Sequence, residues 1–573
     1  MKKKEFLTAF WHLFRGYWKS EHKVKALSLL GVVIGLNFTL VYLLVQINSW
    51  YNEFYNALQA YQTELFWPLI GKFSFLAFLH IAIAVYAVYL RQLLQLRWRK
   101  WMTEQYMKAW LNNQSYYRLQ VMRADMDNPE QRIQQDINEF VTLTLQFILG
   151  FLKQMTTLAA FAVVLWNLSG VFEMQLFGFN LVIPGYMLWF SLLYSIVGTC
   201  LAHVVGRRLI GLNFDQQKYE ADFRFAMTRV RENSESIAFY GGELPEEMTF
   251  RERFKWVVNN YRDLMRQTKF LNFYINGYAQ FAIIVPLIMA APRYFSGAIQ
   301  LGGLMQTTSA FGRVQDALSY FVESYDGIAQ LIAVVHRLTG FTEHLEEVQD
   351  IRSEVCINEN ETAALTASAL TVGLPTERIL LQNCDAVISA GSKLIISGPS
   401  GCGKSTLLRT IAGLWPFAKG SIGWPKDSLR LFLPQRPYLP LGTLRQAIYY
   451  PLAVRDGEDE LLKDILRKVD MEQFADRLDE SDDWSHILSL GEQQRIAFAR
   501  VLLVKPDWLF LDEATSALDE IHEKEMYELL KRELPQMSII SVGHRSTLLC
   551  QHEKMLKIEG GCKWALSEIS AGI

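Results

Sequence analysis

The sequence lacks a dominant charge and lacks paired cysteine motifs. Its 57 Lys and Arg nearly balance 59 Asp and Glu, for a formal net charge of −2, so no strong field favours nucleic acid. None of the six cysteines stands in a CxxC or other metal-ligand spacing. We therefore expect free thiols in a reducing cytosol. The cysteines are Cys200, Cys356, Cys384, Cys402, Cys550 and Cys562.

Long apolar runs are abundant, by contrast, and they concentrate before residue 341. Half of all residues are hydrophobic and 13% are aromatic. Several runs reach the roughly 20 residues that cross a bilayer, and they are too long and too many for buried helices of a soluble domain. The fifth contains Pro286 and the sixth is unusually polar. We predict six spans near 27–47, 68–90, 145–167, 184–206, 271–292 and 303–327.

Lysine and arginine are missing from alternate connections between these runs. The segments NSWYNEFYNALQAYQTELFW and SGVFEMQLFGFN have none, and the fifth loop has only Arg293. The N-terminus and the intervening loops are basic, so we expect both termini on the cytoplasmic side of the bilayer. No small-residue cleavage site follows the first run, which is expected to remain as an anchor. The cytoplasmic loops 91–144 and 207–270 are rich in helix formers, and we expect them to extend the spans.

The fold class follows from how these patterns change along the chain. Residues 1–26 carry aromatic side chains every four positions among basic ones, as in a helix lying in the membrane interface or packed on the protein. Residues 27–341 are predicted to form an all-α six-helix transmembrane domain. The acidic stretch 342–362 is expected to be a solvated linker. In 363–573, short β-like runs alternate with helical ones, which predicts an α/β domain. The aromatic positions are Phe6, Phe10, Phe14 and Trp18.

The stretch GPSGCGKST lies between a β-like run and a helical run of this α/β domain. Its glycines let backbone N–H groups wrap phosphates, Lys404 reaches the β- and γ-phosphates, and Ser405 can bind Mg²⁺. The helix that follows adds its dipole. We therefore predict a P-loop NTPase domain that binds ATP and Mg²⁺. The predicted nucleotide contacts here are Gly398, Pro399, Ser400, Gly401, Cys402, Gly403, Lys404, Ser405 and Thr406.

A second acidic motif lies downstream in WLFLDEATSALDE, where a hydrophobic run ends in Asp512 and Glu513. Asp512 suits the Mg²⁺ shell and Glu513 suits polarisation of the attacking water. Solvated acids at the end of a buried strand are the alternative, and the upstream phosphate loop favours the catalytic interpretation.

The segment ILSLGEQQRIAFAR resembles the signature sequence of ATP-binding-cassette (ABC) proteins. The resemblance implies that Ser489 and Gly491 cap the γ-phosphate across a dimer interface. Two features depart from the family pattern. Leu490 stands where the signature usually has glycine, and LTVGLPTERILLQN lacks the aromatic residue that usually stacks on adenine, leaving Leu374 or Pro375 as a weaker platform.

The same resemblance assigns three further nucleotide-site residues. It implies that Gln435 in LPQRPYLP is the Q-loop glutamine, with a catalytic role and a place beside Mg²⁺. It implies that Asp519 in SALDE is the D-loop aspartate, and that His544 in SVGHRS is the switch histidine. A lone histidine is usually structural, but His544 follows a β-like run downstream of Glu513, which favours the switch role.

The resemblance covers nearly the whole chain. GLWPFAKGSIGWP, LPQRPYLPLGTLRQAIYYP and NSESIAFYGGE resemble the D subfamily of ABC transporters, the peroxisomal acyl-CoA type, which has a second acid in place of Ser236. WRKWMT, YYRLQ and DNPEQRIQQDI resemble the bacterial SbmA/BacA group of peptide and vitamin uptake proteins. The chain is identified as a bacterial, exporter-type half-transporter with fused membrane and ATP-binding domains. MDNPEQRIQQD and SESIAFYGGE are candidate coupling segments.

One phosphate loop and one signature per chain imply a second copy, because a composite ATP site takes its signature from another chain. We expect a homodimer that hydrolyses ATP to move a solute across the bacterial inner membrane by alternating access. The cargo is expected to be polar or amphipathic, such as a corrinoid, peptide or acyl conjugate. Import and export both remain open. An ATP-gated channel or regulator is the alternative.

Polar residues recur along one face of the sixth predicted span. Ionisable groups are costly in lipid, so this stripe should face the dimer interior or a watery cavity. A network of contacts between helices is the alternative. The stripe comprises Gln306, Ser309, Arg313, Asp316, Tyr320, Glu323, Gly327 and Gln330, and the opposite face carries Leu304, Ala310, Val314, Ala317, Leu318, Phe321 and Ile328.

Overall fold

The computed structural model describes residues 3–122, 128–176, 179–350, 354–376, 378–455, 457–560 and 562–569. The chain divides into two compact units. The membrane unit comprises Met1–Trp110 and Asp127–Glu343, and the nucleotide unit comprises Leu111–Met126 and His344–Ile573. Each unit is described separately below.

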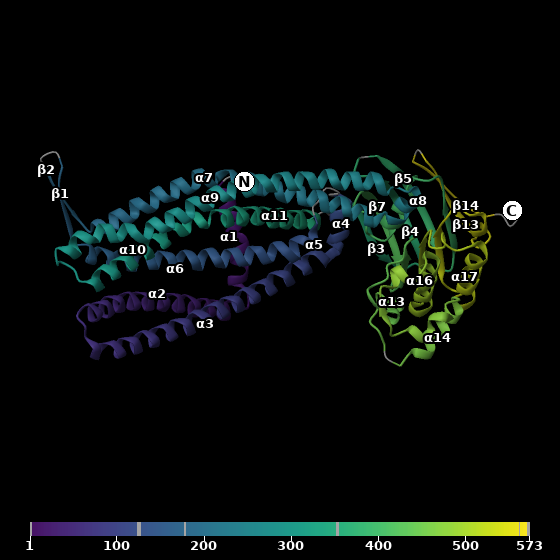
Figure 1. Ribbon diagram of the computed structural model, residues 1–573. Helices are drawn as coiled ribbons and strands as arrows, with labels where there is room; N and C mark the ends of the chain where they lie inside the picture. The colour runs from purple at the N-terminus through teal and green to yellow at the C-terminus, as the bar shows by residue number, and fades with distance from the viewer. Residues whose placement is uncertain are drawn as a thin grey trace. The chain divides into compact units, whose positions relative to one another are not determined.

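Long helices make up the membrane unit (Figure 1). Its helices are α1 (Lys3–Lys19), α2 (Lys23–Gln59), α3 (Thr63–Leu111), α5 (Pro129–Gln131), a π-helical turn (Arg132–Asp136), α6 (Ile137–Ser169), α7 (Tyr186–Glu232), α8 (Ser234–Tyr240), α9 (Glu243–Phe295), α10 (Leu301–Glu323) and the first part of α11 (Tyr325–Asp350). Between α6 and α7, β1 (Val171–Leu176) and β2 (Phe179–Pro184) pair antiparallel as a hairpin beyond the helix ends (Figure 1).

Five of the six predicted spans lie in helices that are long and apolar enough to cross a membrane, within the part of the chain that the structure describes. The sixth, 303–327, covers α10 and the start of α11, and its polar residues keep it out of that set. It is nevertheless a helix at the centre of the unit, because α10 packs against α2, α6, α7 and α9. Its apolar side chains Ala310, Phe311 and Val314 are fully buried there.

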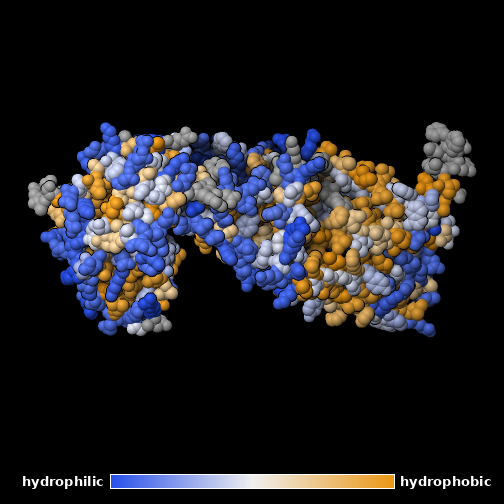
Figure 2. Space-filling model, turned by 180° about the vertical axis from the view of Figure 1, so that it is seen from behind, coloured by the Kyte–Doolittle hydropathy of each residue, from blue (hydrophilic) through white to orange (hydrophobic). Residues whose placement is uncertain are grey.

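Helices α7 and α9 pack against each other and are much longer than a bilayer requires. At 1.5 Å per residue, the 47 residues of α7 and the 53 of α9 give rods of about 70–80 Å, against a hydrocarbon core of about 30 Å. Both helices run through most of 207–270, as expected for helical extensions. Figure 2 shows hydrophobic residues gathered over one part of the helical unit and hydrophilic residues over the rest of the face seen.

Helix α1 packs on the protein through its aromatic face. The Tyr17 ring stacks on Trp98 of α3 at a centroid distance of 5.7 Å, and Phe14 meets the same indole edge-on at 5.5 Å. Trp98 is fully buried. Leu7 and Trp11 remain exposed on the opposite face. The N-terminal aromatic pattern was interpreted as a helix in the membrane interface or as a helix packed on the protein. The contacts of Phe14 and Tyr17 with Trp98 support packing on the protein for this face of α1.

The start of α10 is capped by side chains of α2. The first N–H groups of a helix have no partner within it. Here Gln59 Oε1 accepts from the Leu301 N–H at 2.7 Å, and Asn56 Oδ1 accepts from the Gly302 N–H at 2.8 Å. A Cβ added at Gly302 would lie 2.1 Å from the Asn52 carbonyl oxygen, so only glycine allows this approach.

The same contact continues one turn further, at Gln306. Asn52 Nδ2 donates to Gln306 Oε1 at 2.8 Å, and Asn48 Nδ2 donates to the Gln306 carbonyl at 3.1 Å. Gln306 is buried. It was expected to line a polar path, and the structure instead supports the alternative of contacts between helices at this position.

Arg293 is the basic residue of an otherwise uncharged predicted outer loop, and the structure gives it a local role. Its guanidinium donates to the Leu168 carbonyl at 2.6 Å and to the Ser169 carbonyl. These are the last carbonyls of α6, which otherwise lack partners, and a cation also complements the negative end of a helix. Arg293 thus caps α6 within the membrane unit.

Two β-sheets and the surrounding helices make up the nucleotide unit. The six-stranded sheet has the order β14–β13–β6–β12–β11–β8, and all its neighbouring strands are parallel except the β13–β14 pair. The other sheet has the order β3–β7–β4–β5. The strands of the first are β14 (Lys563–Glu568), β13 (Lys554–Gly560), β6 (Lys393–Ser397), β12 (Ser538–Val542), β11 (Trp508–Asp512) and β8 (Arg430–Leu433), and those of the second are β3 (Glu354–Asn360), β7 (Ala418–Pro425), β4 (Ala364–Gly373) and β5 (Ile379–Ser389).

Helices cover the six-stranded sheet, and its central strands are buried on both faces. The side chains of Leu509 and Phe510 on β11 and of Ile540 on β12 are fully buried, as expected for parallel strands. The principal helices are α12 (Lys404–Ile411), α13 (Leu444–Tyr449), α14 (Asp459–Lys468), α16 (Leu490–Val504) and α17 (Glu520–Glu533). The expected α/β architecture is confirmed.

The expected linker, 342–362, differs from the structure. Helix α11 continues to Asp350, and Glu354–Asn360 forms β3, which pairs in parallel with β7. The segment is polar because β3 lies at a sheet edge, where most of its side chains are exposed while its backbone still pairs.

A short segment between two predicted spans also belongs to the nucleotide unit. Helix α4 (Ser115–Met122) buries Leu119 and packs Val121 against the core that contains Trp415 and Ile422. The candidate coupling segment 126–136 starts in part outside the described residues, and its second half is anchored in the membrane unit. There the buried Asp136 carboxylate pairs with Arg132 at 2.5 Å and with Arg337 at 2.6 Å.

Candidate functional site: a phosphate loop and four strand ends

The predicted nucleotide residues gather at the carboxyl ends of four neighbouring parallel strands. The order β6–β12–β11–β8 places the phosphate loop after β6, His544 after β12, Glu513 after β11 and Gln435 after β8. In open α/β sheets, ligands bind at this edge. The Glu513 N–H also donates to the Val542 carbonyl at 3.1 Å, which fixes two of these ends together.

The phosphate loop has the backbone that its glycines allow. Gly401 and Gly403 adopt positive φ angles of 77° and 103°. A Cβ at Gly403 would also lie 3.0 Å from Leu380 Cδ1. Lys404, the first residue of α12, is buried and donates from Nζ to the carbonyls of Gly398 at 2.9 Å and Pro399 at 3.0 Å. The side chain of Lys404 is therefore held within the phosphate loop.

Ser405 and Asp512 bring two oxygen ligands together. Ser405 Oγ donates to Asp512 Oδ1 at 2.8 Å, which joins the start of α12 to the end of β11. Hydroxyl and carboxylate oxygens at a phosphate-binding loop are what Mg²⁺ prefers. Thr406, one position further, has its carbonyl engaged by Thr410 Oγ1 within the helix.

Glu513 lies between Gln435 and His544. Gln435 Nε2 donates to Glu513 Oε2 at 3.1 Å, and His544 Nε2 lies 3.6 Å from Glu513 Oε1. The three residues predicted as catalytic are thus assembled from three strand ends. Glu513 has a positive φ of 50°, an uncommon conformation for a residue with a side chain, and such conformations concentrate at functional sites.

The signature residues form the start of helix α16. Ser489 is its N-cap, and Ser489 with Glu492 forms a capping box in which each side chain binds the other's backbone N–H. Leu490 is the first residue of the helix, where the backbone does not require glycine, so this departure is compatible with the fold. A Cβ at Gly491 would approach the Ala517 carbonyl oxygen to 3.2 Å, so glycine lets residues 516–519 lie close to the helix.

Asp519 is the N-cap of α17, and its Oδ1 accepts from the His522 N–H at 2.8 Å. Residues 516–519, here called the D-loop, are also held by Gln494 of α16. Gln494 is fully buried, its Oε1 accepts from the Ala517 N–H at 3.0 Å, and its Nε2 donates to the Gln435 carbonyl at 2.9 Å. Gln494 was not among the site residues predicted from the sequence, although it lies inside the signature helix, where such a residue could be expected.

Leu374 is one of the two residues that stand where the adenine-stacking aromatic residue is missing. Its side chain packs partly against the protein core, and its N–H donates to the Arg378 carbonyl at 2.9 Å. Pro375 follows it in a turn. The loss of an aromatic platform therefore stays a prediction from the sequence.

In the membrane unit, the predicted polar stripe is divided. Arg313 and Asp316 are exposed on α10, while Ala310, Val314 and Ala317 on the opposite face are buried. No ion pair joins Arg313 to Asp316 in the described part of the chain, so the pairing that would explain them as packing is not formed. The side chains of Phe321 and Glu323 lie outside the described residues.

Two family models match the chain. Residues 13–295 match ABC transporter transmembrane region 2, and residues 381–516 match ABC transporter. Both matches agree with the two units. The second spans the phosphate loop, Gln435, the signature helix, Asp512 and Glu513.

Relatives match over nearly the full length. An uncharacterized ABC transporter ATP-binding protein of Haemophilus influenzae is 36% identical over 556 residues, covering 97% of this chain and 93% of the relative. The inner membrane ABC transporter ATP-binding protein YddA of Escherichia coli is 33% identical over 537 residues, covering 93% and 94%. The human lysosomal cobalamin transporter ABCD4 is 27% identical over 590 residues, covering 96% and 94%.

A solved structure shares the fold. A bacterial Atm1-family ABC exporter with ATP bound matches with a TM-score of 0.68 at 18% sequence identity, covering 96% of each chain. The expected fold, an exporter-type transmembrane domain followed by an α/β P-loop NTPase domain in the same chain, is therefore confirmed.

Proposed function

Because this chain belongs to the ABC transporter family and hydrolyses ATP to drive transport, we propose that it works as a homodimer with two shared ATP sites. The observation that carries the proposal is the assembly of the phosphate loop, Asp512, Glu513, Gln435 and His544 at adjoining strand ends. The side chain of Ser489, in contrast, forms its described hydrogen bonds with Glu492 in its own capping box. It remains available to a nucleotide held by another copy.

The geometry supports distinct roles in ATP hydrolysis. Lys404 and the loop N–H groups bind the phosphates, and Ser405, Asp512 and Gln435 would hold Mg²⁺. When bound, Mg²⁺ neutralises charge on the phosphates. Glu513 accepts a proton from the attacking water, and Gln435 and His544 orient its carboxylate. Asp519 and the signature residues Ser489 and Gly491 act across the interface between copies.

Exposed aromatic side chains on the helical extensions support a second copy. Phe214 and Phe225 on α7 are 69% and 67% exposed, and Phe254 and Trp256 on α9 are 50% and 53% exposed. These residues lie in the predicted cytoplasmic stretch, beyond the reach of lipid tails. Large apolar surfaces in water mark interaction sites, and a partner copy of the chain would cover them.

Mixing two inactive chains tests the shared sites. Lys404→Ala removes the phosphate-binding cation, and Ser489→Arg fills the space for a γ-phosphate from the other copy. Each homodimer should be inactive, whereas a heterodimer retains one intact composite site and should recover about half of the ATPase activity at most. Purified, verified heterodimers without any recovery would contradict shared sites.

The cargo and the membrane are the finer part of the proposal. Exposed Arg313 and Asp316 on the central helix α10 favour a polar or amphipathic solute, such as a corrinoid, a peptide or an acyl conjugate. The human relative is named for cobalamin and the E. coli relative for the inner membrane. We place the chain in a bacterial inner membrane, with both termini cytoplasmic and movement by alternating access.

Uptake into membrane vesicles tests cargo and direction together. Right-side-out and inside-out vesicles would be loaded with ATP or supplied with it, and a panel of corrinoids, peptides and acyl conjugates would be assayed. Accumulation should require ATP and should vanish with Glu513→Gln. Transport of no solute in either orientation, by protein that hydrolyses ATP, would contradict the proposed cargo classes.

A further inference from the structure

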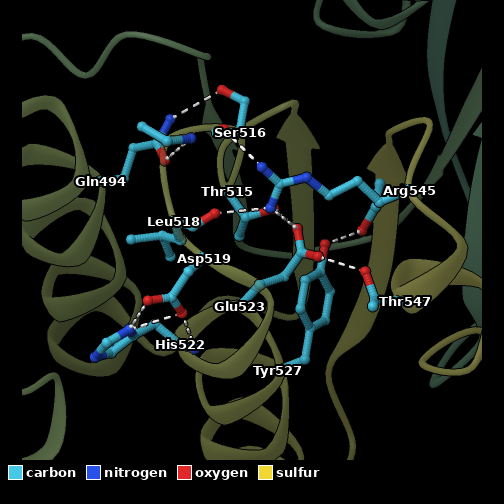
Figure 3. Close-up of polar contacts among 12 residues, drawn as sticks. Gln494, Thr515, Ser516, Leu518, Asp519, His522, Glu523, Tyr527, Arg545 and Thr547 are labelled. Atoms are coloured by element: carbon cyan, nitrogen blue, oxygen red, sulfur yellow. Dashed lines mark hydrogen bonds and ion pairs between the residues drawn. The ribbon is translucent and has the colours of Figure 1, made fainter.

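A buried carboxylate lies outside the set of ATP-binding residues. Glu523, in the first turn of α17, is 1% exposed. Its Oε1 accepts from Thr515 Oγ1 at 2.6 Å, and its Oε2 accepts from Thr547 Oγ1 at 2.7 Å (Figure 3). A buried charge is costly unless it is paired, and the Arg545 guanidinium lies 3.8 Å from Glu523 Oε1.

Arg545 also donates hydrogen bonds to the D-loop. One terminal nitrogen donates to the Leu518 carbonyl at 2.7 Å and the other to the Ser516 carbonyl at 3.0 Å. Figure 3 shows the guanidinium between these carbonyls and Glu523. The planar fork of arginine suits two carbonyls at once, and a lysine could not hold both in this way.

The D-loop is thus fixed from two sides. Gln494 of the signature helix binds the Ala517 N–H and lies 3.3 Å from Ser516 Oγ, while Arg545 binds the carbonyls on either side of Ala517. Three consecutive residues of a surface loop are therefore held by two side chains from different elements. A movement of the signature helix or of the segment that carries Arg545 would therefore move the D-loop with it.

Arg545 directly follows His544, whose Nε2 lies 3.6 Å from the Glu513 carboxylate. A change at the ATP site that displaces the backbone of His544 therefore also displaces the backbone that carries Arg545. The buried Glu523 and its two threonine hydroxyls keep the guanidinium oriented while this happens.

We propose that Arg545, oriented by Glu523, is a positioning residue that links the switch segment at His544 to the D-loop, so that the state of one ATP site is passed on to the other. This rests on the proposed homodimer, in which the D-loop of one copy lies at the interface. The link makes hydrolysis cooperative in ATP, because each site helps to place the loop that completes its neighbour.

Steady-state ATPase kinetics of the full-length reconstituted protein test the link. Arg545→Ala should lower kcat about tenfold, leave KM for ATP within about twofold, and reduce the Hill coefficient to about 1. Arg545→Lys keeps the charge beside Glu523 but loses the fork, so it should keep the thermal transition of the wild type and still show the kinetic loss. Arg532→Ala, at an exposed arginine on α17, the helix that carries Glu523, is the matched control and should change none of these values.

Each outcome of these kinetic measurements supports or overturns the proposed link. If Arg545→Ala destabilises the chain, Arg545→Lys and Glu523→Gln carry the test, because Gln has the shape of Glu523 and keeps one of its two acceptor oxygens. Folded variants with wild-type kcat and Hill coefficient overturn the link. So does a raised KM with unchanged kcat, which would mean an effect on nucleotide affinity alone.

A wild-type Hill coefficient of about 1 also overturns the link. It would leave the homodimer intact if the mixing of Lys404→Ala and Ser489→Arg chains restores activity. Conversely, a failed mixing experiment contradicts the shared sites even where Arg545 variants lose kcat. The two proposals can therefore fail separately.

Discussion

Glu513, the residue proposed to activate water, has an uncommon backbone conformation. Its φ of 50° turns the chain sharply after β11, which directs the carboxylate toward Gln435 and His544 rather than along the strand. Strain of this kind costs on the order of 1 kcal/mol or more. The hydrogen bond from the Glu513 N–H to the Val542 carbonyl at the end of β12 helps to hold the turn.

Glu513→Gln should bind ATP normally and hydrolyse it about 100-fold or more slowly, because the amide cannot accept the proton of the attacking water. The trapped ATP should hold the two copies closed. ATPase rates and equilibrium ATP binding would be measured side by side. Glu520→Gln, an acid at the start of α17, serves as the control. Unchanged hydrolysis would show that another group activates the water.

His552 gives the nucleotide unit a pH dependence. Its ring is buried, with Nδ1 donating to the Leu548 carbonyl at 2.7 Å and Nε2 accepting from Ser541 Oγ at 2.8 Å. Burial lowers the pKa of His552 from 6.5 to about 4. The folded state therefore holds the neutral ring, whereas the unfolded chain takes up a proton below about pH 6.5.

Stability from His552 is fully present above pH 6.5 and is lost as the pH falls toward 4, by up to about 3 kcal/mol. The thermal transition of the full-length protein should fall between pH 7.5 and 5, and His552→Gln should flatten that slope. His486→Gln, at an 87% exposed ring, is the control and should leave the slope unchanged. An unaltered slope in His552→Gln would assign the pH dependence to other groups.

At the scale of elements, α10 separates a buried face from an exposed one. Cysteines at 313 and 316 should react with a water-soluble thiol reagent, and cysteines at 314 and 317 should be protected, because Val314 and Ala317 are buried. The six native cysteines would first be replaced with serine. Labelling rates in membranes give the result, and equal protection of all four positions would exclude a watery path along this face.

The sequence predicted which strand ends carry the candidate nucleotide residues because each of their motifs is local. A buried β-like run followed by glycines, or by Asp512 and Glu513, predicts a strand end, and parallel strands bring their carboxyl ends to one edge. Each motif therefore predicted the strand end at which its residues lie, independently of the other motifs. The strand order, which makes them neighbours, came from the structure.

Other elements depend on partners that no local pattern reveals. The sequence predicts Gln306 as part of a polar stripe, yet its hydrogen-bond partners Asn48 and Asn52 lie more than 250 positions away in the sequence. β3 has the sequence of a linker because most of its side chains are exposed and polar, although Val355 is buried and its backbone pairs with β7. Helix α4 has no apolar run of its own, and its assignment to the nucleotide unit follows from a single buried leucine and the contact of Val121.

For the whole molecule, the exposed aromatic residues of the helical extensions should hold the two copies together. Phe254→Asp and Trp256→Asp should lower the dimer fraction of the detergent-solubilised protein, since each places a charge on an apolar contact surface. Light scattering measures the mass. Lys255→Asp adds the same side chain at an exposed neighbouring position and should leave the dimer intact. A complete dimer in all three variants would place the interface elsewhere.

The capping of α10 by Gln59 and Asn56 of α2 limits how the membrane unit can move. Sliding the two helices apart would break both hydrogen bonds and the close backbone approach at Gly302 together. The paired ends of α2 and α10 therefore act as one rigid lever, and any pivot must lie outside them.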